Sequence, residues 1–245
     1  MQQRNLVILT GAGISAESGI STFRDAGGLW ETHSFEALAS PEGFARDPAL
    51  VHRFYNQRRA HLREVQPNAA HLALAALERA WEGQGRFLLV TQNVDDLHER
   101  AGSRHLAHMH GELRKLRCFA CRTVRHWEGD AGTDTKCAAC GRAGVMRPDI
   151  VWFGEVPYHM GEIAAALAQA DIFCAIGTSA TVYPAAGFAD TAASNRRGCV
   201  LYEINPKPSG NDAFDEVIAA PARTGVPELL RRLNVNEPEI KGEPR

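Results

Sequence analysis

The stretch LVILTGAGISA constrains the fold most, because it joins an apolar run directly to a glycine-rich turn. The run Leu6–Thr10 has the length of a buried parallel strand. Gly11, Gly13 and Ala16 then fit the G-x-G-x-x-G/A spacing of a loop that leads into a helix and binds a pyrophosphate. Gly11 allows the tight turn, Gly13 lets the backbone approach the phosphates, and Ala16 permits close packing of helix and strand. The sequence therefore predicts a nucleotide-binding turn near its start.

Other short apolar runs alternate with helical patterns along the chain. The runs predicted as strands are Phe87–Thr91, Asp171–Gly177, Cys199–Asn205 and the weaker Glu216–Ala219. Apolar residues have helical spacing over Ala69–Ala80 and Ile163–Ala170, in each case just before a strand. Strands that alternate with helices predict an α/β fold with an open, doubly wound parallel sheet of the Rossmann-like type.

Two stretches interrupt this alternation and predict a second, smaller lobe. We expect the Rossmann-like domain to comprise residues 1–29, 69–112 and 150–235. We expect a helical insertion at 30–68 and a zinc-binding insertion at 113–149 to form the small lobe, with a polar tail at 236–245. Because open α/β sheets bind ligands at the carboxyl ends of their strands, the cleft between the lobes is the expected site.

Four of the six cysteines are paired as Cys118-x2-Cys121 and Cys137-x2-Cys140, separated by fifteen residues. This spacing is typical of a tetrahedral four-cysteine zinc site. Four thiolates leave no open coordination position, so we expect one structural zinc per chain. The alternative is four reduced cysteines without a metal. Cys174 and Cys199 lie in apolar runs and are expected in the core.

Composition excludes several classes of function. The 245 residues carry a net charge of −2 with scattered Lys and Arg, so we expect no nucleic-acid partner. No window approaches ~18 uninterrupted apolar residues, so we expect no membrane span. A strand predicted almost at the first residue leaves no room for a signal peptide, and a cytoplasmic location is expected.

Polar residues follow three of the predicted strands. These are Thr91-Gln92-Asn93-Val94-Asp95, Gly177-Thr178-Ser179 and Asn205. Each group alone could be a helix cap, but together they suit hydrogen bonds to ribose and carboxamide groups. A dehydrogenase would also have an acidic residue after a second strand ~20 residues beyond the loop. That interval holds Gly27-Gly28-Leu29-Trp30-Glu31 and no strand, so a bound nucleotide is expected outside the usual dehydrogenase setting.

The segment RHLAHMHGE contains three histidines, His105, His108 and His110. They could form a metal site, or each could be a packed or solvated side chain. His110 differs from the others because it directly precedes Gly111, at the start of the zinc insertion. A neutral imidazole beside the predicted cleft could act as a general base near pH 7.

Together these motifs resemble the sirtuins, a family of NAD-dependent protein-lysine deacylases. The motifs that carry the resemblance are Gly11–Asp25, Thr91–Asp95, His110-Gly111, the paired cysteines, Val151–Glu155, Gly177–Ser179 and Asn205. They occur in the family's order over roughly residues 4–233. Tyr55-Asn56-Gln57-Arg58 makes the chain most similar to the bacterial class III type, which has desuccinylase and deacetylase activity.

The resemblance implies a role for each matching residue. The catalytic residues would be His110, as general base, with Asn93 and Asp95. The NAD-binding residues would be Gly11, Ala12, Gly13, Glu17, Ser18, Gly19, Thr22, Phe23, Arg24, Trp30, Gln92, Asn93, Val94, Asp95, Gly177, Thr178, Ser179, Asn205 and Ala222. The residues that bind the substrate would be Ala39, Tyr55, Arg58, Val151, Trp152, Phe153, Gly154 and Glu155. Acyl-lysine proteins would bind as extended peptides paired with Val151–Glu155.

In the implied reaction NAD is consumed. The acyl-lysine carbonyl oxygen attacks the ribose carbon as nicotinamide leaves. His110 then deprotonates a ribose hydroxyl, which attacks the resulting imidate. The products would be free lysine, nicotinamide and an O-acyl-ADP-ribose, from acetyl-, succinyl- or malonyl-lysine. Tyr55 and Arg58, at i and i+3 of an expected helix, would select acyl groups that carry a carboxylate. Outside the family pattern, Arg58 beside Arg59 would be read as a solvated surface arginine. The small Ala39 would widen the acyl pocket.

Two other functions remain open from the sequence. A protein mono-ADP-ribosyltransferase could use the same NAD site and His110. A non-catalytic NAD or ADP-ribose sensor could use the zinc insertion to contact partners, although His110, Asn93 and Asp95 together argue against it. The sequence does not name the protein substrates or the oligomeric state.

Overall fold

The structure is a computed structural model of the chain that describes residues 3–21, 34–179, 181–195 and 198–235. Its strands are β1 (Leu6–Thr10), β2 (Phe87–Thr91), β3 (Leu106–His108), β4 (Gly111–Cys118), β5 (Val124–His126), β6 (Met146–Ile150), β7 (Ile172–Ile176), β8 (Val200–Ile204) and β9 (Glu216–Ile218). Its helices are α1 (Ala12–Ala16), α3 (Phe35–Leu38), α4 (Pro41–Arg46), α5 (Pro48–His61), α6 (Ala69–Trp81), α7 (Leu97–Ala101), α8 (Met160–Leu167), η1 (Ala185–Gly187), α9 (Phe188–Ala193) and α10 (Ala222–Arg232).

The larger sheet has six parallel strands in the order β3-β2-β1-β7-β8-β9. This order confirms the predicted doubly wound α/β fold. Strands β1 and β2 have the predicted bounds, and β7 and β8 are one residue shorter at each end than predicted. Strand β3 was not predicted, because its three residues lie in the histidine-containing segment and show no apolar run.

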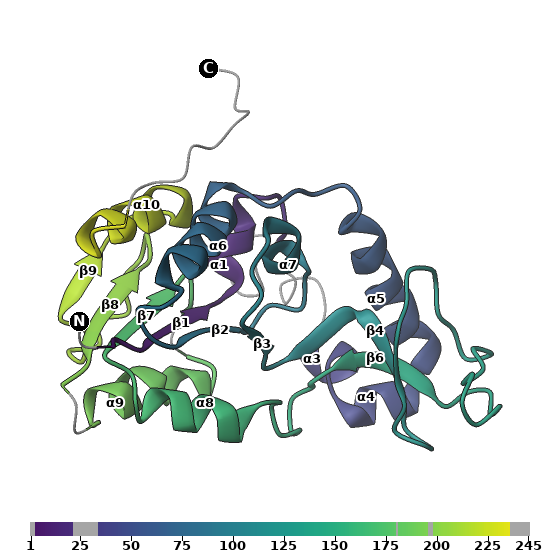
Figure 1. Cartoon of the computed structure of the whole chain (residues 1–245). Helices are drawn as coiled ribbons and strands as arrows, with labels where there is room; N and C mark the ends of the chain where they lie inside the picture. The colour runs from purple at the N-terminus through teal and green to yellow at the C-terminus, as the bar shows by residue number, and fades with distance from the viewer. Residues whose placement is uncertain (1–2, 22–33, 180, 196–197, 236–245) are drawn as a thin grey trace.

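Helices cover both faces of this sheet, as Figure 1 shows for α6 and α10 above it and α8 and α9 below. Alternate residues of β1 face opposite ways, as strand geometry requires. Leu6 and Ile8 join a core with α6 and α10, whereas Val7 and Leu9 join a core with α8 and α9. The strand is therefore buried on both faces, which explains its unbroken apolar sequence.

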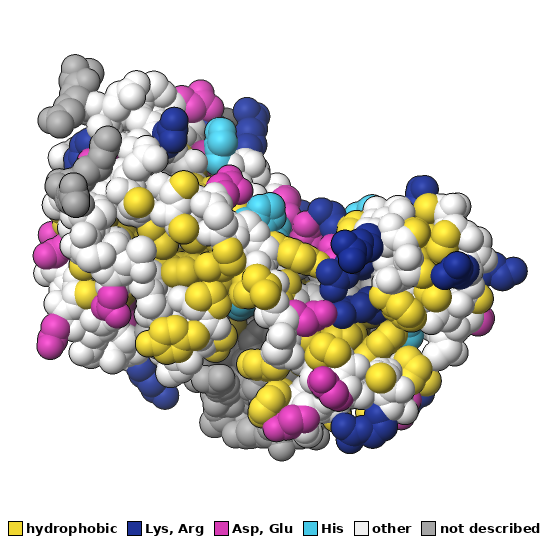
Figure 2. All heavy atoms as spheres, turned by 90° about the horizontal axis from the view of Figure 1, so that it is seen from below, with side chains coloured by type: hydrophobic (Ala, Val, Ile, Leu, Met, Phe, Trp, Pro, Cys, Tyr) yellow, Lys and Arg dark blue, Asp and Glu magenta, His cyan; other side chains and the backbone are white. Residues whose placement is uncertain are grey.

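A second, smaller sheet has the antiparallel order β5-β4-β6. It was expected only as a zinc-binding insertion, without a sheet. Helices α3, α4 and α5 pack beside it, and we call α3–α5 with β4–β6 the small lobe (Figure 1). The space-filling view shows hydrophobic side chains gathered across the middle of the face, between the larger mass on the left and the smaller on the right (Figure 2).

No helix within the described parts of the chain has the length and apolar character needed to cross a bilayer.

Candidate active site

The glycine-rich turn lies where the strand order changes direction, between the neighbouring strands β1 and β7. Gly11 N–H donates to Ile176 O at 3.0 Å, and Gly13 N–H donates to Gly177 O at 2.8 Å. A Cβ at Gly13 would lie 2.7 Å from Gly177 Cα, so backbone meets backbone and no side chain fits. This close contact explains why position 13 is a glycine. Ligands of doubly wound sheets bind at this switch point.

The polar groups predicted at the other strand ends meet at the same place. Gln92 Nε2 donates to Thr178 Oγ1 at 3.0 Å, across from β2 to β7. Asn205 Nδ2 donates to Thr178 O at 2.8 Å, across from β8 to β7. Thr178 therefore joins three strand ends into one polar rim beside the glycine turn.

Asn93 and Asp95 lie under α1 in a buried hydrogen-bond network. Asn93 Nδ2 donates to Gly11 O and to Ser15 Oγ, both at 3.1 Å. The Ser15 hydroxyl donates to Asp95 Oδ2 at 3.0 Å, and Leu97 N–H donates to the other carboxylate oxygen. Burial raises the pKa of Asp95 to about 6, while these hydrogen bonds oppose the rise. Asp95 and Asn93 are thus linked through the Ser15 hydroxyl.

His110 follows β3 and is oriented by the main chain. Its Nδ1 lies 3.0 Å from Gln92 O, which can only accept, so Nδ1 carries the proton and Nε2 keeps a free lone pair. Burial lowers the pKa of His110, and the Gln92 hydrogen bond only partly offsets this effect. A neutral imidazole with an open nitrogen is suited to accept a proton.

The segment 151–155 connects the site with the small lobe. Val151 N–H donates to His110 O at 2.9 Å, and Phe153 N–H donates to Ala39 O at 3.0 Å. Glu155 forms an ion pair with Arg147 and accepts the N–H of Trp152. The chain turns at Phe153–Gly154, where Gly154 has φ +88°. Pairing of this segment with a peptide as an extended strand remains a prediction.

Tyr55 and Arg58 lie on α5, as predicted, and both face the site. The Tyr55 hydroxyl accepts a hydrogen bond from Trp152 Nε1 at 3.0 Å, and burial raises its pKa to about 12. The Arg58 guanidinium lies 3.3 Å from the centre of the Phe54 ring and donates to Phe54 O at 3.1 Å. Burial lowers the pKa of Arg58 to about 10, and its Nε is buried without a hydrogen-bond partner among the described residues.

A cavity of about 1010 Å³ joins these groups. The predicted site residues that line it are Gly11, Ala12, Gly13, Glu17, Ala39, Tyr55, Arg58, Gln92, Asn93, Val94, His110, Val151, Trp152, Phe153, Gly154, Glu155, Gly177, Thr178, Ser179, Asn205 and Ala222. Three predicted residues do not line it. Asp95 is buried and accepts a hydrogen bond from Ser15, Ser18 Oγ accepts a hydrogen bond from Asn68, and Gly19 O contacts His61. Thr22, Phe23, Arg24 and Trp30 lie outside the described residues.

The cavity also has lining residues that the sequence did not reveal. They are Phe54, Ile150, Val156, Pro157, Val182, Tyr183, Pro184, Pro206, Lys207, Pro208 and Ser209. Most of them come shortly after a predicted strand end or motif in the sequence. That proximity was the signal from which they could have been predicted to line the site. Val156 and Tyr183 are large, exposed and apolar at the cavity mouth, which fits a surface that contacts a peptide.

The four paired cysteines meet at the far side of the small lobe. The sulfur atoms of Cys118 and Cys140 are 3.8 Å apart, and those of Cys121 and Cys137 are 3.6 Å apart. All four sulfurs lie within 4.8 Å of one another. Zn–S bonds of about 2.3 Å place tetrahedral sulfurs roughly 3.8 Å apart, so the four cysteines are positioned for a zinc ion.

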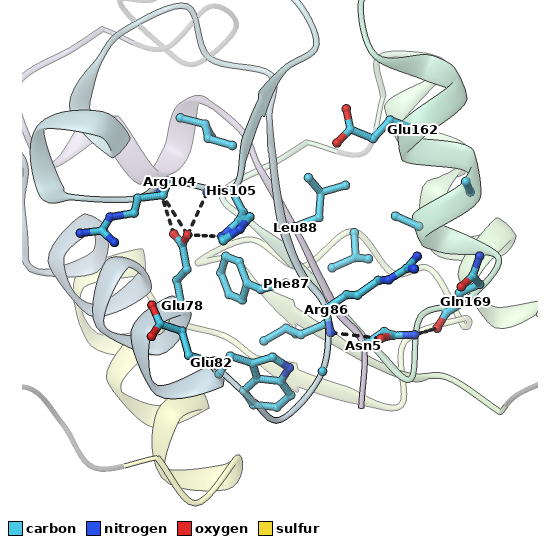
Figure 3. A pocket seen from close by; sticks show the side chains of 17 residues that line it. Asn5, Glu78, Glu82, Arg86, Phe87, Leu88, Arg104, His105, Glu162 and Gln169 are labelled. Carbon is cyan, nitrogen blue, oxygen red and sulfur yellow. Dashed lines mark hydrogen bonds and ion pairs between the residues drawn. The ribbon is translucent and has the colours of Figure 1, made fainter. Parts of the chain in front are cut away.

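A second hollow, of about 680 Å³, lies at the opposite end of the large sheet, where β1 and β2 begin (Figure 3). Its buried carboxylate, Glu78, accepts the N–H groups of Arg104 and His105 and contacts the His105 ring. These bonds satisfy Glu78 as an anchor for the chain before β3. Because parallel sheets bind ligands at the other end, this hollow is not the active site.

Comparison with known proteins decides the family. Residues 11–184 match the Sir2 family, and this match covers well over half of the chain. The chain belongs to the Sir2 family. A relative from Bdellovibrio bacteriovorus described as an NAD-dependent protein deacylase is 56% identical over 230 residues, which cover 93% of this chain and 95% of the relative.

Solved Sir2 structures share the whole fold. A Sir2 homologue in complex with NAD superposes with a TM-score of 0.83 at 41% identity, over 94% of this chain and 89% of the other. A Sir2 protein bound to an acetylated peptide superposes with a TM-score of 0.79 at 27% identity, over 95% of this chain and 94% of the other. Sir2 membership confirms the resemblance that the motifs indicated.

Proposed function

We propose that this Sir2 chain is an NAD-dependent protein-lysine deacylase with one structural zinc, and that it accepts acyl groups ending in a carboxylate as well as acetyl groups. The deacylase activity is supported by the Sir2 match, the deacylase relative and the cavity that joins nucleotide-binding and catalytic residues. The acyl preference depends on one observation, the uncompensated Arg58 cation in the cavity wall.

The residues at the switch point fit the two polar ends of NAD. Thr178, Gln92 and Asn205 offer hydroxyl and amide groups at the strand ends, and Ala222 and Glu17 extend the same rim. Glu17 also accepts the N–H of Arg223 at 3.0 Å and so connects the rim with α10. Bound NAD supplies an electrophilic ribose carbon with nicotinamide as its leaving group. His110 Nε2 is the group placed to take a ribose hydroxyl proton.

Arg58 has no counter-ion in the part of the chain that the structure describes. No carboxylate within the described residues forms an ion pair with it, and its contacts are the Phe54 ring and carbonyl oxygen. A partly buried cation without a partner is costly, so an acyl carboxylate would supply the missing charge. The Tyr55 hydroxyl can donate to the same carboxylate, because its own acceptor lone pair already receives the Trp152 N–H. Succinyl- and malonyl-lysine have this chemistry.

Transfer of ADP-ribose to a protein is the alternative reaction at such a site. The relatives and structures reported above are deacylases and Sir2 proteins with NAD or an acetylated peptide, and these favour deacylation. The two reactions differ in products, because deacylation yields free lysine and O-acyl-ADP-ribose, whereas ADP-ribosylation leaves ADP-ribose on the protein.

The test is a panel of acetyl-, malonyl- and succinyl-peptides, with and without NAD, analysed by product mass spectrometry. In Arg58→Met we expect kcat/KM for succinyl-peptide to fall about 10- to 100-fold, the effect of losing charged hydrogen bonds. Acetyl-peptide turnover should change by no more than a few-fold. Arg53→Met is the matched control, because Arg53 lies exposed on the same helix. An equal fall for both peptides would refute the acyl preference.

A further inference from the structure

We propose that Asn56 and Arg59 are positioning residues for acyl selection. They attach α5 to the segment 129–131 of the zinc-binding region and so hold Tyr55 and Arg58 in the cavity wall. The inference rests on the proposed acyl preference, because only a carboxylate-bearing substrate depends on where Arg58 lies. It assigns a role in specificity to residues that do not line the cavity.

Asn56 binds the main chain of Ala131 through two reciprocal hydrogen bonds. Its Nδ2 donates to Ala131 O at 2.9 Å, and its Oδ1 accepts Ala131 N–H at 3.1 Å. This pairing resembles one rung of a β-ladder made by a side chain. It connects residues 75 positions apart in the sequence, so it holds two separate parts of the small lobe together.

Arg59 strengthens the same attachment from inside the lobe. Only 2% of its surface is exposed. Its Nε donates to Leu113 O at 3.0 Å, and its Nη1 donates to Asn56 Oδ1 at 2.9 Å and to Gly129 O at 3.1 Å. Burial lowers the pKa of Arg59 to about 10, while the nearby Asp130 and Glu128 carboxylates oppose this effect. The segment thus provides both hydrogen-bond acceptors and compensating charge for a buried cation.

The attached segment is continuous with the zinc site. Ala131 is buried in a cluster with Cys118, Cys137, Leu116 and Met146. Two of the four zinc-ligand positions, Cys118 and Cys137, therefore belong to the same buried cluster as the residue that Asn56 holds. A change at the zinc site, such as loss of the metal, would act on α5 through this cluster.

The same helix turn carries the acyl-selecting pair. Asn56 and Arg59 directly follow Tyr55 and Arg58 in sequence, so the two pairs occupy neighbouring faces of α5. Tyr55 is held on its far side by Trp152. Among the described residues, the Arg58 guanidinium is held by its stacking on Phe54 and its bond to Phe54 O, both within α5. The placement of Arg58 relative to the cavity therefore depends on what fixes the helix itself.

The experiment measures acyl selectivity, the ratio of kcat/KM for succinyl-peptide to that for acetyl-peptide, in Asn56→Ala. We expect the ratio to fall about tenfold, mainly through a higher KM for succinyl-peptide, with the KM for NAD unchanged. Gln57→Ala is the matched control, because Gln57 is the exposed next residue, and it should leave the ratio unchanged. Hydrogen exchange should become faster over residues 54–59 in Asn56→Ala only.

A second pair of variants guards against loss of folding. Arg59→Lys keeps the cation and one donor and should retain more of the selectivity than Arg59→Met. If Arg58→Met lowers the ratio but Asn56→Ala and both Arg59 variants leave it at the wild-type value, the positioning role is wrong and the acyl preference stands. If wild-type enzyme shows no succinyl activity that depends on Arg58, the proposed function itself fails. Zinc loss from Asn56→Ala without a lower ratio would also overturn the positioning role.

Discussion

The His110 ring donates from Nδ1 to the main-chain carbonyl of Gln92, so its other nitrogen faces the cavity without a proton. Because burial lowers the pKa of this imidazole below 6.5, the neutral base persists to more acidic pH than an exposed histidine. The acid limb of kcat/KM against pH should therefore have its midpoint below pH 6.5. We expect His110→Asn to lower kcat by about 10²–10⁴-fold. His105 is an exposed histidine at the opposite end of the sheet, so His105→Asn should leave kcat and the midpoint of the acid limb unchanged.

Asp95→Asn should separate stability from activity. Burial raises the pKa of this carboxyl from 3.8 to about 6, above its unfolded value. Its contribution to stability is therefore fully present below about pH 4 and is lost as pH rises through about 6. Above about pH 6 the charged carboxylate costs about 3 kcal/mol. The neutral amide that this substitution introduces should raise the free energy of unfolding at pH 8 and not at pH 4, while activity falls.

Urea unfolding at pH 4, 6 and 8 measures this effect, with Asp212→Asn as the exposed control. A stability gain of the same size at all three pH values would show that the Asp95 carboxyl does not titrate as its burial implies.

Zinc should be held by the paired cysteines and by no other thiol. Cys121→Ser removes one of the four converging sulfurs, so bound zinc should fall from one per chain toward zero and the melting temperature should drop. Cys199→Ser changes a half-buried cysteine in the large domain and should keep its zinc. Elemental analysis with thermal unfolding distinguishes the two. Retention of a full zinc equivalent by Cys121→Ser would contradict the four-sulfur site.

Gly177→Ala should disrupt the nucleotide-binding turn. Gly177 has φ +59°, and a Cβ there would lie 2.6 Å from Ile14 N. Gly83 has a similar φ of +79° with no atom near its Cβ position, so Gly83→Ala measures the backbone strain alone. We expect Gly177→Ala to cost about 1–3 kcal/mol more than Gly83→Ala and to weaken NAD binding. Equal unfolding free energies for the two variants would mean that the turn has room to adjust.

The sequence predicted the elements whose signal is local. The apolar run of β1 and the spacing of its glycines indicate a buried strand and a tight turn, and the structure has both. The spacing of the four cysteines likewise predicts that their sulfurs meet, and in the structure they do. Tyr55 and Arg58 could be placed on one helix face by their separation alone.

Features that depend on distant contacts were not predictable in this way. Strand β3 is three residues long and is a strand because it pairs with β2. Apolar and polar residues alternate only weakly along β4. Its partners β5 and β6 come later in the chain, within and at the end of the zinc-binding segment. The motif could not show that the Asp95 carboxylate is buried and bound by the Ser15 hydroxyl and the N–H of Leu97, because Ser15 is 80 positions away in the sequence.

Because Ala131 follows Asn56 by 75 residues, the hydrogen bonds between them can form only some time after α5 has been synthesised. At about 5–20 residues per second, the ribosome completes α5 roughly 4 to 15 seconds before the segment that receives it. The acceptors of Arg59 at residues 113 and 129 follow it by 54 and 70 positions, so they too are absent for most of that interval. The half of the small lobe that carries Tyr55 and Arg58 is therefore made first, and its hydrogen bonds to the zinc-binding half can form only after that half has been translated.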